Sequence, residues 1–491
     1  MRFASIAAAL LATAAISATP LSAQHAGLPA QISSIVERAP NDRAHWGIEV
    51  VDAVTGAALI RHNGDRLFVP ASTVKLVIAA AAAHYLLPDF RYVTTLETAG
   101  AVTDGVLHGD LVLRGTGDPT ISGRYADGML SIWNALADSL RARGIVRIAG
   151  SVVGDESHWD ADHVRPDWEV YDLLWWYAAP AGALGFNDNA IDFSVGPGAV
   201  GSPAVITWRP ETSFFTFVNR TTTVPAGGEA TLDFTRLPGT DTIIAYGSIP
   251  AAAARRTEYF AVDDPARYAA TVFRETLERE GIEVSRDSVR VIRGVSVVAP
   301  GTSPTAPSRS VLVEHRSVPL PQLIAPVLQT SQNWFAEQLL KTIAREIGGA
   351  GSWEKGLELE RRFLIDIVGI DSTAFRLRDA SGLSAGNLMT PHTLVQILTY
   401  VQSTPRLAPA LDALPVAGAR TGSLRSRLQD LSGRVRAKTG SISNVDSLAG
   451  FLTAASGRRV IFAIVANNTA QSSARIRSAI DDIARAIAAA Y

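Results

Sequence analysis

This 491-residue chain lacks one residue type and has little of another, and each deficit excludes or favours a kind of chemistry. It contains no cysteine, which excludes disulfide bonds, thiolate metal sites and a cysteine nucleophile. Only four of its 45 basic residues are lysines, namely Lys75, Lys341, Lys355 and Lys438. Because arginine stays protonated whereas a buried lysine can become a neutral base, each retained lysine is a candidate for proton transfer. The net charge is only −2, so nucleic acid is not expected as a partner.

Long apolar runs are also scarce. The run at residues 6–18 follows Arg2 and precedes the small residues Ser22 and Ala23. This layout is typical of a signal peptide at residues 1–23, cleaved after Ala23. The alternative is a membrane anchor, but the run is shorter than the ~20 residues that a span needs. We therefore expect an exported, periplasmic protein with no stable membrane span.

The two ends of the chain share one pattern. Short apolar strands are predicted near both ends, at residues 46–51, 57–61, 448–455 and 460–467, and a buried helix at 72–86. Such elements can pair into an antiparallel sheet with helices across a face, which is an α/β (α+β) arrangement. We assign residues 24–91 and 311–491 to this discontinuous domain.

The middle of the chain, residues 92–310, is richer in short strands and turns. It ends in a Pro/Ser/Thr-rich stretch at residues 299–310, which is typical of a linker. We interpret the middle as an insertion into the domain formed by the two ends.

Ser72 and Lys75 form an S-x-x-K motif at the start of the predicted buried helix. Residues three apart lie on one helix face, so the amine can reach the hydroxyl. A serine becomes a nucleophile when a nearby base takes its proton, and a desolvated lysine can be that base. The structural alternative is a serine near a helix start beside a solvated lysine.

Two further short motifs follow in the chain. Ser331 and Asn333 form S-x-N, which could also be an ordinary helix cap. Lys438, Thr439 and Gly440 form K-T-G after an alternating strand-like segment, which could also be a strand-end turn. The three motifs occur in the order typical of penicillin-binding proteins and β-lactamases, and two of the four lysines are the two that the set requires.

The sequence resembles the serine D-alanyl-D-alanine carboxypeptidase/endopeptidase family, the low-molecular-mass class C penicillin-binding proteins. Ser72 and Ser331 lie 259 residues apart, which matches the large insertion of that family. Further matching segments are 109–120 (GDLVLRGTGDPT), 154–157 (GDES), 183–189 (ALGFNDN), 379–384 (DASGLS) and 420–424 (RTGSL). The resemblance implies a β-lactamase-like catalytic domain with a five-stranded antiparallel sheet. It also implies two mainly β inserted domains, no cofactor, and peptidoglycan stem peptides and β-lactam antibiotics as partners.

The resemblance also implies roles in acyl transfer. Ser72 corresponds to the nucleophile, Lys75 to its proton acceptor, and Ser331 to the hydroxyl that passes a proton to the leaving amine. The backbone N–H groups of Ser72 and Ser441 correspond to the oxyanion hole, where one donor is typically worth about 3 kcal/mol.

The remaining roles concern substrate binding. Asn333 corresponds to the residue that binds the substrate's amide carbonyl, Lys438 to a source of positive potential, and Thr439 to the residue that meets the terminal carboxylate. Asp155 corresponds to an aspartate that faces the amine of the substrate's third side chain. Ala385 stands where relatives commonly have an arginine for the carboxylate of that side chain, which predicts weaker carboxylate selection.

Three alternatives remain beside this interpretation. A β-lactamase would share the acylation step, but Ser331 and the long insertion argue against it. A non-catalytic cell-wall-binding protein would be expected to have lost a motif residue. A metal hydrolase is suggested only by the cluster His158, Asp160, Asp162 and His163, which a surface loop explains better.

Overall fold

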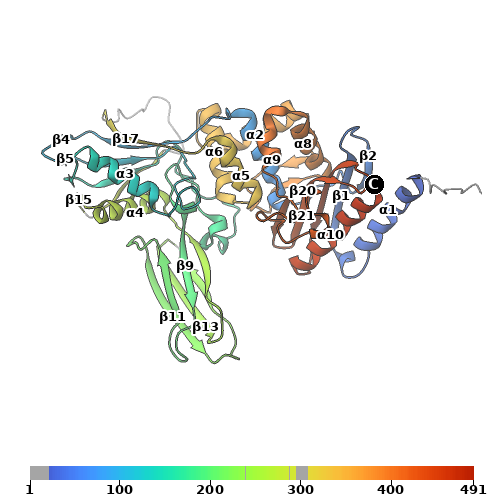
Figure 1. The fold of residues 1–491 in the computed structure, drawn as a ribbon, viewed down its shortest axis with the longest axis horizontal. Helices are drawn as coiled ribbons and strands as arrows, with labels where there is room; N and C mark the ends of the chain where they lie inside the picture. The colour runs from blue at the N-terminus through green and yellow to red at the C-terminus, as the bar shows by residue number, and fades with distance from the viewer. Residues whose placement is uncertain (1–20, 238, 287, 295–307) are drawn as a thin grey trace, which may run out of the picture.

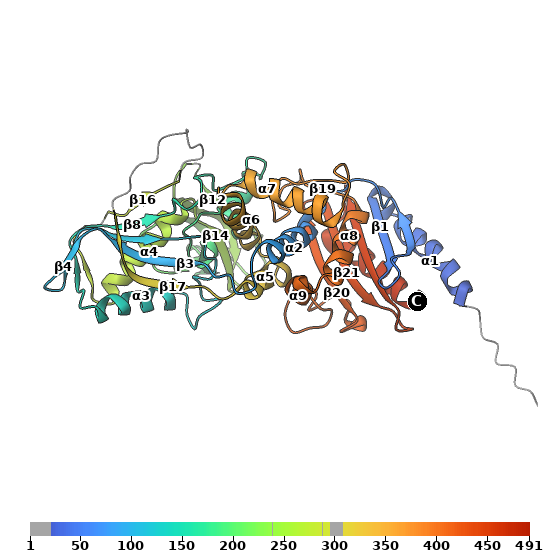
Figure 2. The same cartoon turned by 90° about the horizontal axis from the view of Figure 1, so that it is seen from above.

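The structure is a computed structural model that describes residues 21–237, 239–286, 288–294 and 308–491. Residues 1–20 of the predicted signal peptide and residues 299–307 of the predicted linker lie outside these ranges. The chain forms an elongated molecule with a terminal part at one end, made of residues 21–91 and 317–491, and an insert at the other (Figures 1 and 2). None of the helices that the structure describes combines the length and apolarity needed to cross a bilayer.

The terminal part contains the predicted five-stranded antiparallel sheet, in the order β2-β1-β22-β21-β20. Its strands are β1 (His45–Asp52), β2 (Ala58–His62), β20 (Val435–Ile442), β21 (Val445–Thr453) and β22 (Arg459–Asn467). Pairing of β1 with β22 joins the two ends of the chain, with Trp46 opposite Ala466. The sequence therefore predicted this sheet correctly, with strand boundaries shifted by a few residues.

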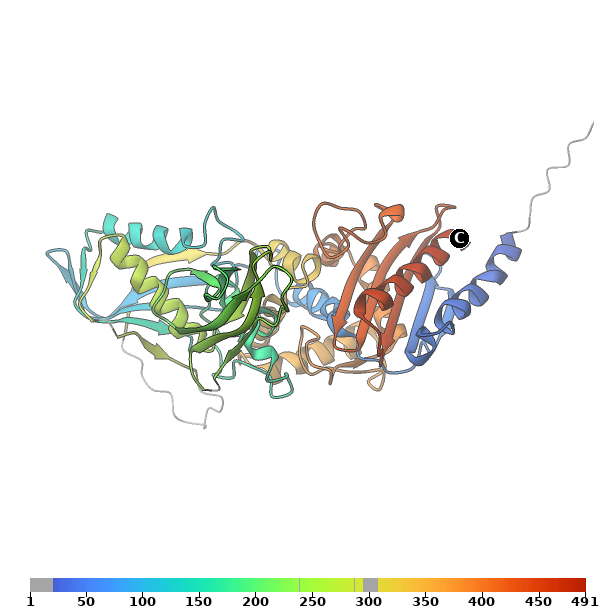
Figure 3. The ribbon, with the colours of Figure 1, turned by 90° about the horizontal axis from the view of Figure 1, so that it is seen from below.

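Helices cover both faces of this sheet. Successive residues of β22 point to opposite faces, so Phe462 and Ile464 enter one core and Ile461 and Ala463 the other. The first core lies under α1 (Leu21–Val36) and α10 (Ser473–Ala490), which cross the outer face side by side (Figure 3). The second core lies under α2 (Lys75–Tyr85), α5 (Leu320–Gln329), α6 (Asn333–Gly348) and α8 (Pro391–Ser403). Burial on both faces explains why β22 is almost wholly apolar.

Among its described residues, the insert contains four small sheets and two α-helices around one shared core. The layer with helices α3 (Ser131–Ala142) and α4 (Pro265–Arg279) has two mixed sheets. One sheet consists of β3 (Val93–Thr98), β6 (Leu111–Arg114), β8 (Val152–Asp155), β16 (Arg290–Ile292) and β17 (Ser310–Arg316). The other sheet consists of β4 (Ala101–Thr103), β5 (Val106–His108), β7 (Arg147–Ile148) and β15 (Glu283–Val284).

A second region of the insert projects sideways from the first (Figure 1). It consists of the sheets β10-β9-β14 and β11-β13-β12. Their strands are β9 (Ala190–Gly196), β10 (Val205–Arg209), β11 (Thr216–Val224), β12 (Asp233–Arg236), β13 (Thr242–Pro250) and β14 (Arg256–Ala261).

The end of the insert differs from the sequence prediction. The boundary was placed after residue 310, but β17 pairs with β3 and therefore belongs to the insert. The terminal part resumes at Ser317, because strand pairing rather than the Pro/Ser/Thr-rich composition decides where the segment belongs. The terminal part also contains α7 (Trp353–Arg362), the π-helical turn η6 (Phe363–Val368), β18 (Phe375–Arg376), β19 (Leu388–Met389) and α9 (Ala408–Asp412).

Candidate active site

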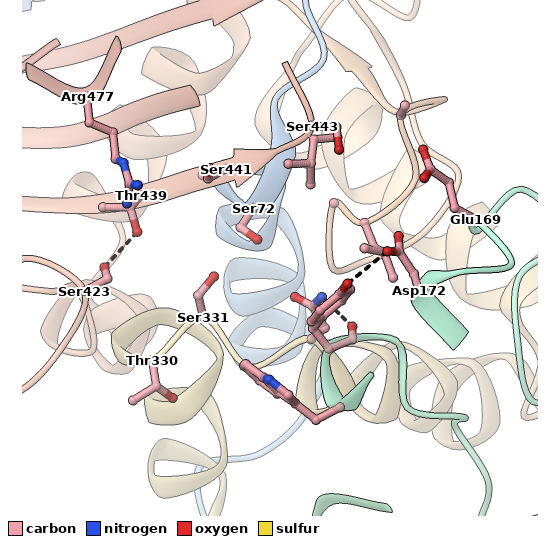
Figure 4. Close-up of a pocket in the computed structure, with 18 of the residues that line it drawn as sticks. Ser72, Glu169, Asp172, Thr330, Ser331, Ser423, Thr439, Ser441, Ser443 and Arg477 are labelled. Atoms are coloured by element: carbon pink, nitrogen blue, oxygen red, sulfur yellow. Dashed lines mark hydrogen bonds between the residues drawn. The ribbon is translucent and has the colours of Figure 1, made fainter. Parts of the chain in front are cut away.

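Ser72 lies where the helical layer meets the edge strand β20 of the terminal sheet. It belongs to a 3-10 turn, η2 (Ala71–Val74), that leads directly into α2, so the predicted helix becomes α-helical only from Lys75. The strand can approach this turn because Gly440 has no side chain. A Cβ at Gly440 would lie 3.0 Å from the Ser72 backbone nitrogen and 2.8 Å from the carbonyl oxygen of Pro70. The glycine of K-T-G thus brings Ser441 beside Ser72 (Figure 4).

Lys75 lies directly behind Ser72 and is fully buried. Its Nζ donates hydrogen bonds to Ser72 Oγ at 2.7 Å, to Asn333 Oδ1 at 2.6 Å and to the carbonyl oxygen of Ser381 at 2.5 Å. Burial lowers the pKa of Lys75 to about 7, against the opposing effect of the Asp379 and Glu337 carboxylates. An amine at this distance and with this pKa can accept the hydroxyl proton near neutral pH.

Glu337 is a buried carboxylate behind Lys75 that the sequence analysis did not single out. It lies one helical turn after Asn333 on α6 and accepts hydrogen bonds from the backbone N–H of Ser381 at 2.8 Å and from Trp353 Nε1 at 2.7 Å. Burial, followed by the charge of Asp379, raises the pKa of Glu337 to about 7. Its spacing of four residues from Asn333 was the available sequence signal.

Asp379 organises the loop that carries the D-A-S-G-L-S segment. Its carboxylate accepts hydrogen bonds from the backbone N–H groups of Gly382 and Ser384, from Asn387 Nδ2 and from Trp168 Nε1, at 2.7–2.9 Å. Together, Asp379 and Glu337 hold the loop so that the carbonyl of Ser381 points at Lys75. The sequence analysis recognised the segment but assigned it no role.

Ser331 and Lys438 form the opposite side of the site. Lys438 Nζ donates to Ser331 Oγ at 2.8 Å and to the carbonyl oxygen of Thr439 at 2.6 Å. Burial and the neighbouring Lys75 lower the pKa of Lys438 well below its usual value. Ser331 has a φ of +61°, a left-handed conformation that an ordinary residue adopts only under strain and that is common at functional sites.

These groups surround a cavity of about 630 Å³. Ser72, Ser331, Asn333, Thr439 and Ser441 all line it, whereas Lys75 and Lys438 are buried behind the lining. Asn333 uses its Nδ2 to donate to the carbonyl of Tyr177 at 2.6 Å, which leaves one amide proton for a ligand.

The two ends of this cavity carry opposite charges. Thr439 Oγ1 donates to Ser423 Oγ at 2.8 Å at the end where Arg427 and Arg477 lie. Asp167, Glu169 and Asp172, from the insert, line the other end together with Ala385. Figure 4 shows Glu169 and Asp172 on the side of Ser72 away from Arg477.

The structure does not bring Asp155 to this cavity. Asp155 ends β8 inside the insert, is 3% exposed, and accepts hydrogen bonds from Ser157 and Arg309. Its carboxylate is therefore engaged within the insert, and the prediction that it faces a substrate amine is wrong. Asp167, Glu169 and Asp172 of the insert line the cavity instead, which only the path of the chain could reveal.

The segment with His158 and His163 ties the insert to α6. Lys341 is buried, donates to Asp160 Oδ1 at 2.8 Å, and lies 4.0 Å from the centre of the Trp353 ring. His163 Nε2 lies 3.1 Å from Glu156 Oε2. Within the described ranges, no three His, Cys, Asp or Glu side chains are arranged to hold a metal ion.

Comparison with known proteins agrees with this geometry. The profile of the D-Ala-D-Ala carboxypeptidase 3 (S13) family matches residues 28–487. A D-alanyl-D-alanine carboxypeptidase of Actinomadura sp. (strain R39) is 33% identical over 475 residues, which cover 93% of this chain and 85% of that protein. The D-alanyl-D-alanine carboxypeptidase DacB of Haemophilus influenzae is 27% identical over 419 residues, which cover 82% and 81% of the two chains.

The fold has a counterpart among solved structures. Penicillin binding protein 4 of Haemophilus influenzae superposes with a TM-score of 0.79 at 24% sequence identity, over 93% of this chain and 98% of that one. The profile match covers most of the chain, and the Actinomadura relative exceeds 30% identity over most of its length. The chain therefore belongs to the D-Ala-D-Ala carboxypeptidase 3 (S13) family.

Proposed function

We propose that this serine D-Ala-D-Ala carboxypeptidase cleaves stem peptides through an acyl-enzyme on Ser72. The observation that carries the assignment is the 2.7 Å hydrogen bond from Lys75 Nζ to Ser72 Oγ, made by a buried amine whose pKa is lowered to about 7. Lys75 accepts the proton as Ser72 Oγ attacks the carbonyl carbon of the D-Ala-D-Ala bond. The adjacent N–H groups of Ser72 and Ser441 stabilise the oxyanion.

Collapse of this intermediate breaks the C–N bond and requires a proton on the leaving amine. Ser331 Oγ lies in the cavity and is hydrogen-bonded to Lys438, so we assign the proton transfer to Ser331. Water then hydrolyses the ester on Ser72. Thr439, beside Ser423, is assigned to the terminal carboxylate, and Asn333 to the substrate's amide carbonyl.

We assign the acidic end of the cavity to the substrate's side chain. Asp167, Glu169 and Asp172 line it, and Ala385 supplies no positive charge there. Tyr177 Oη donates to Asp172 Oδ1 at 3.0 Å, which orients that carboxylate toward the site. This arrangement favours a side chain that carries an amine over one that also carries a carboxylate.

A β-lactam should acylate the same serine, because its strained amide presents a carbonyl carbon to the same nucleophile. The test is the intact mass of the protein after incubation with penicillin, followed by peptide mapping. We expect one adduct on Ser72, and none in Ser72→Ala, with the thermal unfolding of the variant unchanged. An adduct on another serine contradicts the assignment, and rapid loss of the adduct with turnover indicates a β-lactamase.

We also propose that residues 1–23 are removed on export to the periplasm. Leu28, Ile32 and Val36 of α1 enter the core, and all three lie beyond the predicted cleavage site. Cleavage after Ala23 would therefore keep these three side chains in the core. N-terminal sequencing of protein from its own host should begin near Gln24, and an intact Met1 would contradict the proposal.

A further inference from the structure

Lys341 is fully buried, yet none of the roles assigned above uses it. It lies on α6, one helical turn after Glu337 and two turns after Asn333. Residues four apart share a helix face, so these three side chains follow one another along the face of α6 that carries the asparagine of S-x-N. The lysine is therefore aligned with groups of the active site without lining its cavity.

The amine of Lys341 is held by the insert. Its Nζ donates hydrogen bonds to Asp160 Oδ1 at 2.8 Å, to the carbonyl oxygen of Asp162, and to that of Ala181 at 3.4 Å. Three acceptors match the three protons of an ammonium group, whereas a neutral amine has only two. Burial lowers the pKa of Lys341, and the carboxylates of Asp160, Asp162 and Glu156 oppose that effect. The insert thus favours the charged form of this amine.

The insert segment that holds Lys341 packs tightly on the terminal part. The backbone N–H of Asp160 donates to the carbonyl oxygen of Gly351 at 3.1 Å, in the connection between α6 and α7. A Cβ at Gly351 would overlap the ring of Trp159, so the two backbones meet closely here. Asp160 and Asp162 belong to the cluster that suggested a metal hydrolase, and here they hold a lysine instead.

Trp353 lies between Lys341 and Glu337. It begins α7, is 2% exposed, and has its ring centre 4.0 Å from Lys341 Nζ. The Nε1 of the same ring donates to Glu337 Oε2 at 2.7 Å. A cation is attracted to the face of an indole ring, so Lys341 holds the ring that carries this donor. The hydrogen bond from Trp353 lowers the pKa of Glu337, against the larger effect of burial.

Glu337 passes the effect on to Lys75. Its carboxylate accepts from the backbone N–H of Ser381, whose carbonyl accepts from Lys75 Nζ, and its charge raises the pKa of Lys75. The other carboxylates that interact with Glu337 are Asp379 and Glu360, and both disfavour a further negative charge there. The donor on the indole ring is therefore among the contacts that favour an ionised carboxylate beside the base.

We propose that Lys341 is a positioning residue of the active site, through which the insert acts on the catalytic base Lys75. The path runs from Asp160 to Lys341, across the ring of Trp353 to Glu337, and from there to Lys75. This inference rests on the proposed role of Lys75 as base. It gives the insert a part in the proton transfer through residues that do not line the substrate cavity.

The test is the pH dependence of kcat/KM for D-alanine release in Lys341→Met, which removes the charge and keeps a long side chain. Without the cation the indole donor is held less firmly, Glu337 is ionised less, and Lys75 loses its proton at lower pH. We expect the acidic limb to move down by about half a pH unit, less than the roughly 1–3 units of a direct charge contact. Loss of direct repulsion between the two lysines would move the limb to higher pH, so the sign separates the two effects.

Two further variants test the path itself. Trp353→Phe keeps a ring and removes the N–H donor, so it should also move the limb to lower pH. In a Glu337→Gln background, Lys341→Met should add no further shift, because the carboxylate on which it acts is absent. Shifts that add, or an unchanged limb in Trp353→Phe, overturn the inference. If Lys341→Met does not fold, the pair Asp160→Asn and Lys341→Met replaces it, since the pair leaves no unpaired carboxylate.

Lys355→Met is the matched control, because it removes a lysine charge from the surface of α7, where Lys355 pairs with Glu358. Its acidic limb should coincide with that of wild type. An unchanged limb in folded Lys341→Met, or an equal shift in Lys355→Met, overturns the inference and leaves the proposed function intact. A wild-type protein that releases no D-alanine would instead contradict the proposed function.

Discussion

The surroundings of Lys75 and Lys438 differ although both lysines are fully buried at one cavity. Lys75 has two carboxylates behind it, Glu337 and Asp379, which oppose the effect of burial on its pKa. For Lys438 the two causes, burial and the charge of Lys75, act in the same direction and lower the pKa. The carboxylates thus keep Lys75 basic enough to accept a proton.

The same neighbours bear on the role predicted for Lys438, which is to supply positive potential. Burial and the charge of Lys75 lower its pKa well below the usual value. Its hydrogen bond to Ser331 instead suggests a part in moving the proton of that hydroxyl. The two lysines of the motif set are therefore distinguished by their neighbours.

The largest expected effect comes from replacing each buried lysine by arginine. Lys75→Arg should lower kcat by at least about a hundredfold, because arginine cannot accept the proton of Ser72 and general-base catalysis is typically worth 10²–10⁴-fold. Lys438→Arg should retain measurable D-alanine release. Steady-state assays of both variants check these two expectations, and thermal unfolding of each variant shows that it is folded. Comparable full activity in both variants would refute the role of Lys75 as base.

A substrate-selection experiment addresses the acidic end of the cavity. Ala385→Arg should raise the preference for a peptide with a diaminopimelic acid side chain over one with lysine by roughly ten- to a hundredfold, since a charge-assisted bond to a carboxylate contributes about 1.5–3 kcal/mol. The ratio of kcat/KM for the two peptides measures this preference, and Ala385→Met is the control for the size of the new side chain. A strong wild-type preference for diaminopimelic acid that Ala385→Arg does not change would contradict the proposed charge pattern.

The acidic limb of the pH profile should respond to Glu337. Lys75 accepts a proton only when neutral, so kcat/KM should rise with pH through about 7 in wild type. Glu337→Gln removes a carboxylate that raises the pKa of Lys75, so this limb should move to lower pH.

Glu360→Gln provides the control for the pH experiment. Glu360 is buried on α7, burial raises its pKa well above the usual value, and neither of its carboxyl oxygens has a hydrogen-bond partner among the described residues. Burial therefore disfavours its charged form, and replacing it by an amide should leave the limb in place. Equal shifts in both variants would show that Glu337 acts through packing rather than charge.

The smallest effect is expected at Lys355, whose side chain is 34% exposed and pairs with Glu358 on the surface of α7. Lys355→Arg should change activity by less than twofold and stability by no more than about 0.5 kcal/mol, as is usual for surface positions. Chemical denaturation and D-alanine release measure the two. A marked loss of activity would show that Lys355 has a functional role although it lies on the surface.

Much of the site could be predicted from the sequence because its motifs are local. Ser72 and Lys75 are one turn apart, and Ser331 and Asn333 are separated by one residue, so short spacing already determines which side chains can meet. An antiparallel sheet was also predictable, since its apolar strands lie near both ends of the chain, and the family resemblance implied that it has five strands. An insertion of more than 200 residues was visible as a change in pattern between them.

Only the tertiary structure decided which distant residues act on these motifs. Glu337 and Asp379 act on the charge of Lys75 because α6 and the loop after β18 fold against α2. The helical spacing from Asn333 indicates Glu337, whereas no local pattern links Asp379 to Lys75. For the same reason the family resemblance selected Asp155, whereas the folded chain presents Asp172 to the cavity. Local spacing sets which groups can react with one another. Long-range packing sets the pKa values of these groups and the part of the substrate that they face, because burial and charge depend on neighbours from the whole chain.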